Sequence, residues 1–588
     1  MRVLALTPPG RFPTTIADLG AWWAAVAANG QHEVLRFSAN YAWWGTICGA
    51  GMKELVLQPL GRLDRLRRRA LWRSENIALK EDSAAAALAL AALQTPAPYA
   101  TADTYINTIT PIASYLADLN RAQTEFTIDI GNGAHVRGLN YIDSATLVRY
   151  SRQDTLLSRT IAAALSGCPN DLGFVALSVT GLEDLLTSMI AARHLRARNS
   201  NVHVSLIDHG NENFSLHAHM PALRAAGTLD TVFDSIVVSK DERDDLVPAL
   251  IDAVGAGRVV RGYLMRASLP GIRPSAPRRV SPPPPLPTFS PEPILVTRLS
   301  DRRCYWSRCS YCAHNNKYDD RGAPAHADIP NTLDRIEAFI AAGYSRHVNF
   351  ADEALSPSML RQLARELERR QLTLNWVCRC KIERAHDAEL FAQIAKVGCK
   401  EIQYGLETTS PRMLKLMDKY VDGIDEPRIA QTFRDMAAVG IGVHVNLIGG
   451  FPGDTLIDTE GSVEFIRREF ANLRSASYFI SAFTLLPDTP IVQAPEQFGL
   501  REIAAHGDIA QAMTYQLRSD IAEATQAVVD AIPRLDQRLA DDLAWSRLAD
   551  GPAGAMVMAL YFGSGHGALF KARADNPFGD PKLARATG

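Results

Sequence analysis

The stretch PILVTRLSDRRCYWSRCSYC, residues 293–312, joins a predicted strand to three closely spaced cysteines. Pro293–Arg298 is a short apolar run with β-branched residues, a pattern typical of a buried strand. Cys304, Cys309 and Cys312 follow it, with four and then two residues between them. We therefore expect the cysteines on the loop that leaves the carboxyl end of this strand.

Five further helix-then-strand units follow the cysteine loop. Apolar residues recur at helical spacing before the strands, as at Leu333, Ile336, Phe339 and Ile340. Six strands with outer helices predict a partial (β/α)6 barrel of the TIM type over residues 293–495, with its chemistry on loops at the carboxyl ends of the strands. The later strands are predicted at RHVNFAD (346–352), TLNWVCR (373–379), EIQYGLE (401–407), VHVNLIGG (443–450) and ASYFISAF (476–483).

The first part of the chain also alternates short strands with helices. This alternation predicts an α/β, doubly wound, Rossmann-like domain over residues 1–265, whose ligand lies at the carboxyl ends of the strands. A helix is predicted at 16–28, and an insertion at about 39–150 is expected to be irregular. No GxGxxG follows the first strand, so a nicotinamide dinucleotide is not indicated. Strands are predicted at RVLALT (2–7), HEVLRF (32–37), GFVALSV (173–179), VHVSLI (202–207) and DSIVV (234–238).

Two further segments complete the predicted domain layout. Residues 266–292 are rich in proline, which removes backbone donors and favours an extended, semi-rigid linker. Residues 496–588 predict a small, mostly helical C-terminal domain over the barrel mouth. Within the insertion, Arg62–Arg73 carries a run of basic residues. We interpret that run as a solvated helix face, with a docking surface for a partner as the alternative.

Composition narrows the class of protein. The formal net charge of the 588 residues is −2, without the basic excess that a nucleic-acid partner favours. The longest apolar run, Ala84–Leu93, is well short of a membrane span, and no signal peptide is evident, so we expect a cytoplasmic protein without a membrane partner. Thiols stay reduced in that compartment, which favours metal binding or catalysis over disulfides.

Three clustered thiolates suit one kind of metal centre in particular. They can ligate three corners of a [4Fe–4S] cluster, whereas a structural zinc site needs four ligands. Cys378, Cys380 and Cys399 are candidates for a fourth ligand, but they lie on or beside predicted strands, where core positions are the commoner explanation. A cluster with three protein ligands keeps one iron open to a substrate or cofactor.

The cysteine loop after the first barrel strand, with an aromatic residue in its second gap, resembles the radical S-adenosylmethionine (SAM) superfamily. The usual first gap in that family has three residues, and here it has four. Other family-like segments follow in order: an acidic pair closing the second strand, GLE (405–407), NLIGGFPGDT (446–455) and LLPDTP (485–490). Asp454 replaces the usual glutamate, and Asn446 replaces a glycine.

The resemblance implies a set of SAM contacts. A glutamate after the fourth strand accepts from ribose hydroxyls, the acidic pair lies near the SAM amino group, and the glycine-proline segment packs against adenine. For the arginine and this glutamate, an internal ion pair inside the barrel is the competing interpretation. The residues carried over are Tyr311, Asp352, Glu353, Arg379, Glu407, Ile448, Gly450 and Pro452.

An N-terminal doubly wound domain ahead of such a barrel is similar to the cobalamin-dependent branch of the family. The D-x-H-x-x-G motif of that branch is absent after the first strand, so cobalamin would bind without an axial histidine from this domain, although His209 is a candidate ligand. A domain that keeps the fold and binds no corrin is the alternative. The implied cobalamin contacts are Pro8, Pro9, Ser178, Thr180, Asp208, Gly210 and Glu242.

What the resemblance implies is a cobalamin-dependent radical SAM C-methyltransferase that acts on an unactivated carbon of a natural product or peptide. It would use a [4Fe–4S] cluster, SAM, cobalamin and an external electron donor of the flavodoxin or ferredoxin type. One alternative is a radical SAM enzyme that catalyses cyclisation, ring contraction or epimerisation. Another, of a different class, is a non-catalytic iron–sulfur or zinc module.

Overall fold

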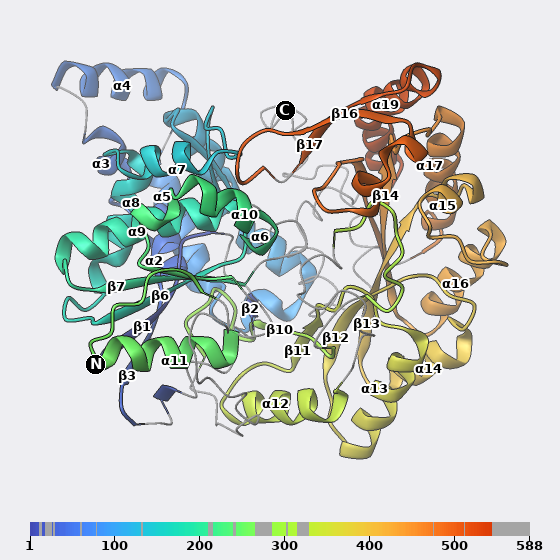
Figure 1. Ribbon diagram of the computed structural model, residues 1–588, viewed down its shortest axis with the longest axis horizontal. Coiled ribbons are helices and arrows are strands. Elements are labelled where there is room, and N and C mark those ends of the chain that lie inside the picture. Colours follow the sequence, from blue (N-terminus) through green and yellow to red (C-terminus); the bar gives the residue numbers. More distant parts are fainter. Residues whose placement is uncertain are drawn as a thin grey trace.

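A computed structural model of the chain contains two parallel sheets, with helices packed against both (Figure 1). The mixed α/β fold class is confirmed, because every pairing within these two sheets is parallel. The structure describes residues 1–10, 15–17, 26–27, 30–58, 62–77, 79–130, 133–209, 216–238, 243–264, 285–300, 304–313, 328–473, 475–510 and 512–543.

The first sheet has the strand order β3-β1-β6-β7-β8-β9. The chain therefore reverses direction across the sheet between β1 and β6, which is the switch point where ligands of doubly wound sheets bind. Alternate residues of β1 and β6 enter two different apolar clusters, one on each face of the sheet. The strands are β1 (Arg2–Thr7), β3 (Glu33–Ser38), β6 (Phe174–Val179), β7 (His203–Asp208), β8 (Ser235–Val237) and β9 (Gly262–Leu264).

The insertion expected to be irregular is largely helical, so that expectation is wrong. Its helices bury a core that includes Trp43, Trp44, Tyr115 and Phe126, and this burial explains why the segment folds despite its weak strand pattern. Helices of the first domain are α2 (Ala39–Ile47), α3 (Met52–Leu57), α4 (Arg62–Ser74), α5 (Leu79–Ala92), α6 (Ala102–Ala122), α7 (Ser144–Ser151), α8 (Leu156–Ala164), α9 (Leu182–Arg198), α10 (Leu216–Ala226) and α11 (Arg243–Gly255), with a hairpin of β4 (Phe126–Asp129) and β5 (Gly133–Val136).

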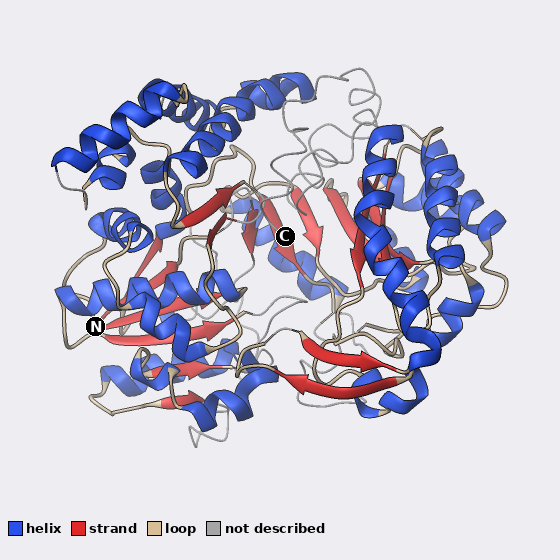
Figure 2. Ribbon diagram, turned by 90° about the horizontal axis from the view of Figure 1, so that it is seen from above, coloured by secondary structure: helices blue, strands red, loops and turns tan. Residues whose placement is uncertain are grey.

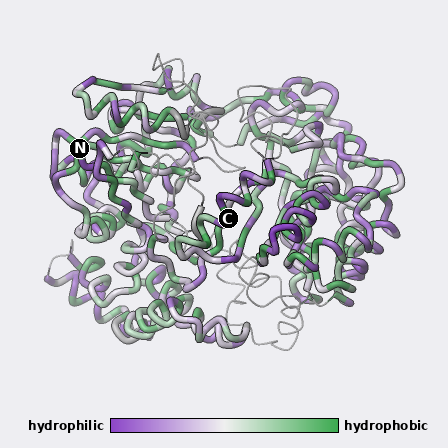
Figure 3. Tube along the Cα trace, turned by 90° about the horizontal axis from the view of Figure 1, so that it is seen from below, coloured by the Kyte–Doolittle hydropathy of each residue, from purple (hydrophilic) through white to green (hydrophobic). Residues whose placement is uncertain are grey.

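The basic run Arg62–Arg73 forms most of α4, which lies at the margin of the molecule (Figure 1). Leu66 and Leu71 on this helix are exposed, whereas Trp72 is buried. Figure 3 shows hydrophilic and hydrophobic residues alternating along most helices, as expected of helices with one buried face.

The second sheet has the strand order β15-β14-β13-β12-β11-β10-β2. Six strands follow each other in chain order, as in an open (β/α)6 arrangement, and their helices cover one face (Figures 1 and 2). We call the opposite face the inner face. The strands are β10 (Ile294–Thr297), β11 (His347–Phe350), β12 (Asn375–Cys380), β13 (Cys399–Glu407), β14 (Gly442–Gly449) and β15 (Ala476–Ala482), and the helices are α12 (Ile329–Ala341), α13 (Pro357–Arg370), α14 (Ala388–Lys396), α15 (Pro411–Leu416), α16 (Glu426–Ala438), α17 (Leu456–Phe470) and α18 (Pro490–Gln493).

The seventh strand comes from the other end of the chain. β2 (Thr15–Ala17) pairs in parallel with β10, so the helix predicted at 16–28 is wrong at its start. The rest of that prediction falls on residues 18–25 and 28, outside the described residues, and on Val26 and Ala27, which are helical. An edge strand such as β10 offers unpaired backbone groups, and β-branched Thr15 and Ile16 suit a strand that completes the pairing.

The C-terminal part begins with a hairpin that the sequence did not predict. β16 (Leu500–Ala505) and β17 (Met513–Leu517) precede the long helix α19 (Ser519–Leu543), which packs on α17, β14 and β15. The hairpin reaches the first domain, where the Ile509 amide donates to the Ile142 carbonyl at 3.1 Å and the Ser144 amide donates to Asp508 at 2.7 Å (Figure 1). None of the helices in the described part of the chain is both long and apolar enough to span a membrane.

Candidate active site

The cysteine loop is attached to the carboxyl ends of β10 and β11 by one carboxylate. Asp352, two residues after β11, accepts hydrogen bonds from the Leu299 amide at 2.9 Å and the Ser300 amide at 2.8 Å. Burial raises the pKa of Asp352, and these hydrogen bonds oppose the rise by favouring the ionised form. The carboxylate predicted to lie near SAM therefore holds the start of the loop.

A second set of contacts holds the middle of the loop against the segment after α15. The Ser310 amide donates to the Met417 carbonyl at 3.0 Å, and the Trp306 indole N–H donates to the Asp418 carbonyl at 2.9 Å. Arg308 forms an ion pair with the Asp418 carboxylate at 2.7 Å. The cysteine loop is thus held at its start by the Asp352 carboxylate and in its middle by Met417 and Asp418, and the cysteine pattern indicates neither contact.

The three cysteines are each partly exposed on this loop, and burial raises the pKa of Cys309. Within the described residues, no three His, Cys, Asp or Glu side chains already converge as metal ligands. Three thiols on one loop are nevertheless the donor type that an iron–sulfur cluster takes. Cys378, Cys380 and Cys399 are buried in the apolar core, which agrees with core positions.

Glu407 and Tyr311 meet at a lysine that the sequence analysis missed. Lys419 donates to Glu407 Oε1 at 2.6 Å and to the Tyr311 hydroxyl at 3.2 Å, and Tyr311 donates to the same Glu407 oxygen at 3.0 Å. Burial alone would lower the pKa of Lys419, but Glu407 and the nearby Cys309 outweigh it, and the pKa is raised. A buried cation thus lies beside the cysteine loop. No spacing rule pointed to Lys419, because it follows Glu407 by twelve residues across a helix and a turn.

The backbone at Glu407 is unusual for a strand end. Its φ is +62°, and the pairing of β13 with β14 shifts register between Gly405 and Glu407. A Cβ on Gly405 would lie 2.6 Å from Glu407 Oε1 and 2.7 Å from Lys419 Nζ, so the glycine makes room for the ion pair on the inner face. Left-handed backbone at a non-glycine residue costs about 1–3 kcal/mol and is often found at functional sites.

An internal ion pair is the competing interpretation of Arg379 and Glu407, and the structure pairs Arg379 with Glu353. Arg379 lies 3.8 Å from the Glu353 carboxylate, and Arg298 donates to the same carboxylate at 3.2 Å. Burial lowers the pKa of Arg379 to about 10, so the guanidinium remains charged at neutral pH. Glu353 and Arg379, both predicted SAM contacts, therefore lie near the carboxyl ends of β11 and β12, each with a charged partner.

The segment after β14 owes its shape to Asp454 and Gly450. Asp454 accepts from the Gly450 amide at 2.8 Å and from the Thr455 amide at 2.8 Å. Gly450 has a φ of +75°, and a Cβ there would lie 2.5 Å from Val529 of α19. Asp454, at the position where the resemblance implies a glutamate, therefore keeps a turn-forming carboxylate.

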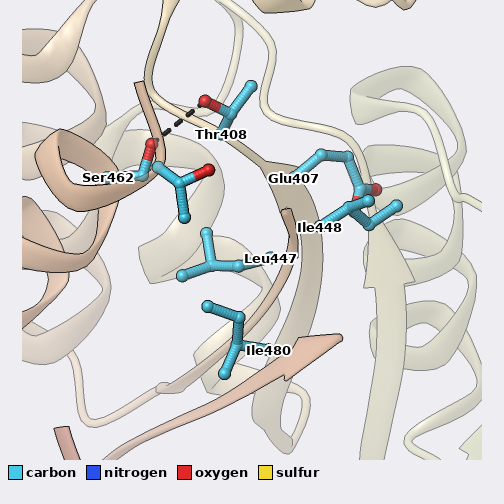
Figure 4. Close-up of a pocket in the computed structure, with 7 residues that line it drawn as sticks. Glu407, Thr408, Leu447, Ile448, Ser462 and Ile480 are labelled. Carbon is cyan, nitrogen blue, oxygen red and sulfur yellow. Dashed lines mark hydrogen bonds between the residues drawn. The ribbon is translucent and has the colours of Figure 1, made fainter. Parts of the chain in front are cut away.

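A narrow crevice lies behind the strand ends and has no room for a ligand, or even for a water molecule. Figure 4 shows Ser462 and Thr408 hydrogen bonded on one side, while Glu407 and Ile448 extend away from them. The two predicted SAM contacts therefore point toward the inner face. The crevice is lined by Glu407, Thr408, Leu447, Ile448, Thr459, Ser462 and Ile480.

The predicted cobalamin contacts that the structure describes gather at the carboxyl ends of β1, β6 and β7. The Pro9 carbonyl accepts from Thr187 at 2.7 Å, the Thr180 amide donates to Asp184 at 3.1 Å, and Asp208 accepts from the Leu216 amide at 2.9 Å. These bonds shape the loops at the carboxyl end of the first sheet, and the first two lie at its switch point.

The remaining predicted cobalamin contacts lie near the same strand ends or outside the described residues. Pro8 and Ser178 are buried at the same sheet edge, and His209, the candidate axial ligand, follows β7. Gly210 and Glu242 lie outside the described residues.

Comparison with known proteins supports the resemblance to the radical SAM superfamily. Residues 302–466 match the sequence model of the radical SAM superfamily. No curated protein sequence matches the chain. The radical S-adenosylmethionine methyltransferase TsrM from Kitasatospora setae, solved with tryptophan substrate and the SAM analogue aza-SAM bound, is 14% identical over 90% of this chain and 82% of its own, with a TM-score of 0.47.

A second similar structure is the cobalamin-dependent S-adenosylmethionine radical enzyme OxsB, solved with aqua-cobalamin and S-adenosylmethionine bound. It is 16% identical over 69% of this chain and 68% of its own, with a TM-score of 0.43.

Proposed function

We propose that this chain, which carries a radical SAM domain at residues 302–466, is a cobalamin-dependent C-methyltransferase that acts on an unactivated carbon of a natural product or peptide. The observation that carries the proposal is the cysteine loop at the carboxyl end of β10, with the Tyr311–Glu407–Lys419 group beside it. Active sites of barrels of this type lie at that end of the strands.

The three cysteines would hold a [4Fe–4S] cluster. A cysteine thiol must lose its proton to ligate iron, and a nearby cation favours the resulting thiolate. Lys419 supplies such a cation, because its charge acts on both Cys309 and Cys312. Asp352 and the Met417 carbonyl would keep the loop in place while the cluster is bound.

SAM would lie between the cysteine loop and the inner face. Glu407 would accept from ribose hydroxyls, Arg379 would hold the SAM carboxylate, and Ile448 with the Gly450–Pro452 backbone would pack against adenine. Glu353 keeps Arg379 oriented through their ion pair at 3.8 Å. Bound together, the cofactors would supply the reductive cleavage of SAM and the methyl group, while the protein positions the substrate and excludes water.

Cobalamin would lie at the switch point of the first sheet, against Pro8, Pro9, Ser178 and Thr180. In the net reaction, the substrate, two SAM molecules and two electrons from a flavodoxin- or ferredoxin-type donor give the methylated product, 5′-deoxyadenosine, methionine and S-adenosylhomocysteine. The substrate hydrogen ends on 5′-deoxyadenosine, and the methyl group comes from the second SAM.

The test is anaerobic purification with hydroxocobalamin supplied, followed by incubation with SAM and dithionite. We expect about one cobalt per chain and formation of 5′-deoxyadenosine. Formation of 5′-deoxyadenosine without bound cobalt would favour cyclisation, ring contraction or epimerisation instead. Failure to form 5′-deoxyadenosine with a fully loaded cluster would contradict the radical SAM chemistry altogether.

A further inference from the structure

The inner face of the second sheet carries a polar row that the cofactor contacts do not use. Gln403, His444 and Ser477 are register partners on β13, β14 and β15, and Asn446 and Phe479 are partners one step nearer the carboxyl ends. Side chains on the other face of β14 and β15, such as Val445 and Leu447, enter the apolar core. Alternation along a strand therefore places the polar row on the inner face.

His444 connects this row by hydrogen bonds. Its Nδ1 lies 2.7 Å from Ser477 Oγ, and its Nε2 lies 3.2 Å from Asn446 Oδ1. Burial, reinforced by the charge of Arg379, lowers the pKa of His444 to about 4, so the ring is neutral at physiological pH. In the tautomer that satisfies both contacts, Nε2–H donates to Asn446 and Nδ1 accepts from Ser477. This arrangement leaves unused the Asn446 amide N–H groups, the second lone pair of Asn446 Oδ1 and a lone pair of Ser477 Oγ.

Phe479 adds an uncovered aromatic surface to the row. It is 57% exposed, and among the exposed large apolar residues of the described chain it is the one that lies on a strand; the others are on helices or a loop. Exposed aromatic rings are common ligand contacts, because they offer apolar area and stacking geometry.

The row is continuous with the candidate active site. Gly405, beneath the Glu407–Lys419 pair, is the register partner of Asn446, which in turn pairs with Phe479. Two strand spacings of about 4.8 Å separate Gly405 from Phe479, so a ligand on Phe479 lies about 10 Å from the ion pair. That distance is within the length of a small molecule.

We propose that Phe479, Asn446 and Ser477 bind a planar ring of the substrate that has no positive charge and carries one hydrogen-bonding N–H group, and that His444 is the residue that positions Asn446 and Ser477. A cationic ring is disfavoured because Arg379, the register partner of Gln403 in this row, remains charged at neutral pH. The inference rests on the proposed function for the identity of the occupant as substrate, but its test needs no turnover.

Indole and indene serve as matched probes, since they share size and shape while only indole has an N–H group. Binding to the full-length, cluster-loaded protein is measured by saturation-transfer NMR titration. We expect indole to bind several-fold more tightly than indene. Phe479→Ser should weaken both probes by about tenfold, whereas Leu88→Ser, at a site 73% exposed on α5, should weaken neither.

His444→Leu should leave indene binding unchanged and abolish the preference for indole, whereas His444→Gln, which retains a donor, should restore part of it. A purely structural role of His444 would weaken both probes equally. The proposal would be overturned if indole and indene bound equally to all variants, or if neither probe bound. Phe479 would then be a contact for a protein segment instead. Either result alongside normal 5′-deoxyadenosine formation would leave the proposed function intact.

Discussion

At the scale of single residues, the sequence identifies side chains with a motif and misses their partners. Glu407 and Arg379 were found because they end predicted strands in a family-like order. Lys419 and His444 carry no such pattern, and only the fold brings Lys419 to Glu407 or pairs His444 with Ser477. The ion-pair interpretation and the cofactor interpretation of Arg379 and Glu407 are compatible, since each residue is paired within the candidate site.

Lys419→Met should leave the Glu407 carboxylate buried without its cation. Their side chains are only 10% and 8% exposed, so we expect a loss of about 3–5 kcal/mol in the free energy of unfolding. Adding Glu407→Gln to this variant should recover part of the loss. Urea unfolding measures both, with Lys396→Met as control. Its pair with Glu368 is exposed, and we expect that change to cost less than about 1 kcal/mol.

Glu401 predicts a pH dependence of stability. Burial raises the pKa of this carboxyl from 4.5 to about 7, so the folded state favours the protonated form. Stability from this group is fully present below about pH 4.5 and declines by roughly 3 kcal/mol as pH rises to about 7. Glu401→Gln should therefore raise the unfolding free energy more at pH 8 than at pH 5. An equal effect at the two pH values would disprove this explanation.

At the scale of elements, the strands of both sheets were predictable because their apolar runs are short, β-branched and regularly spaced. The strand β2 and the hairpin β16–β17 were not, because their pairing depends on a partner far away in the sequence. The helices of the insertion were missed for a similar reason. Their stability comes from a shared core around Trp43 and Trp44 rather than from a regular local pattern.

Gly450 provides a test of how α19 is seated on the strand ends. Gly450→Ala requires a side chain at a φ of +75° and a Cβ 2.5 Å from Val529, so we expect a loss of about 1–3 kcal/mol. Gly461→Ala, inside α17 with open space around it, should instead gain about 0.5–1 kcal/mol. Thermal and urea unfolding distinguish these outcomes, and a gain at Gly450 would show that α19 is packed differently.

At the scale of the whole molecule, the hairpin β16–β17 links the candidate active site to the first domain. Its base packs with Phe451, Phe483 and Leu485 in an apolar cluster that Tyr311 also contacts. Its tip is held by Asp508, which accepts from the amide and hydroxyl of Ser144. The domain layout remains a prediction, but these contacts give the two parts a common surface around the proposed cofactors.

Asp508→Ala should loosen the hairpin tip without disturbing its base. We expect amide hydrogen exchange at Ser144 and Ile509 to become roughly tenfold faster, because one charged hydrogen-bonding group is worth about 1.5–3 kcal/mol at most. Exchange at Met513, whose amide donates to the Leu485 carbonyl at 2.7 Å, should stay the same. Asp520→Ala, at an exposed site, is the control; matching exchange in both variants would mean that Asp508 does not hold the tip.

The most direct test of the account is the iron content of the chain after anaerobic reconstitution with iron and sulfide. The wild-type protein should bind about four iron atoms and develop a broad brown absorption, and Cys304→Ser, Cys309→Ser and Cys312→Ser should each lose most of both. Cys378→Ser and Cys399→Ser, at buried core positions, should retain them. Iron binding that survives loss of the loop cysteines but not of the core cysteines would contradict the account.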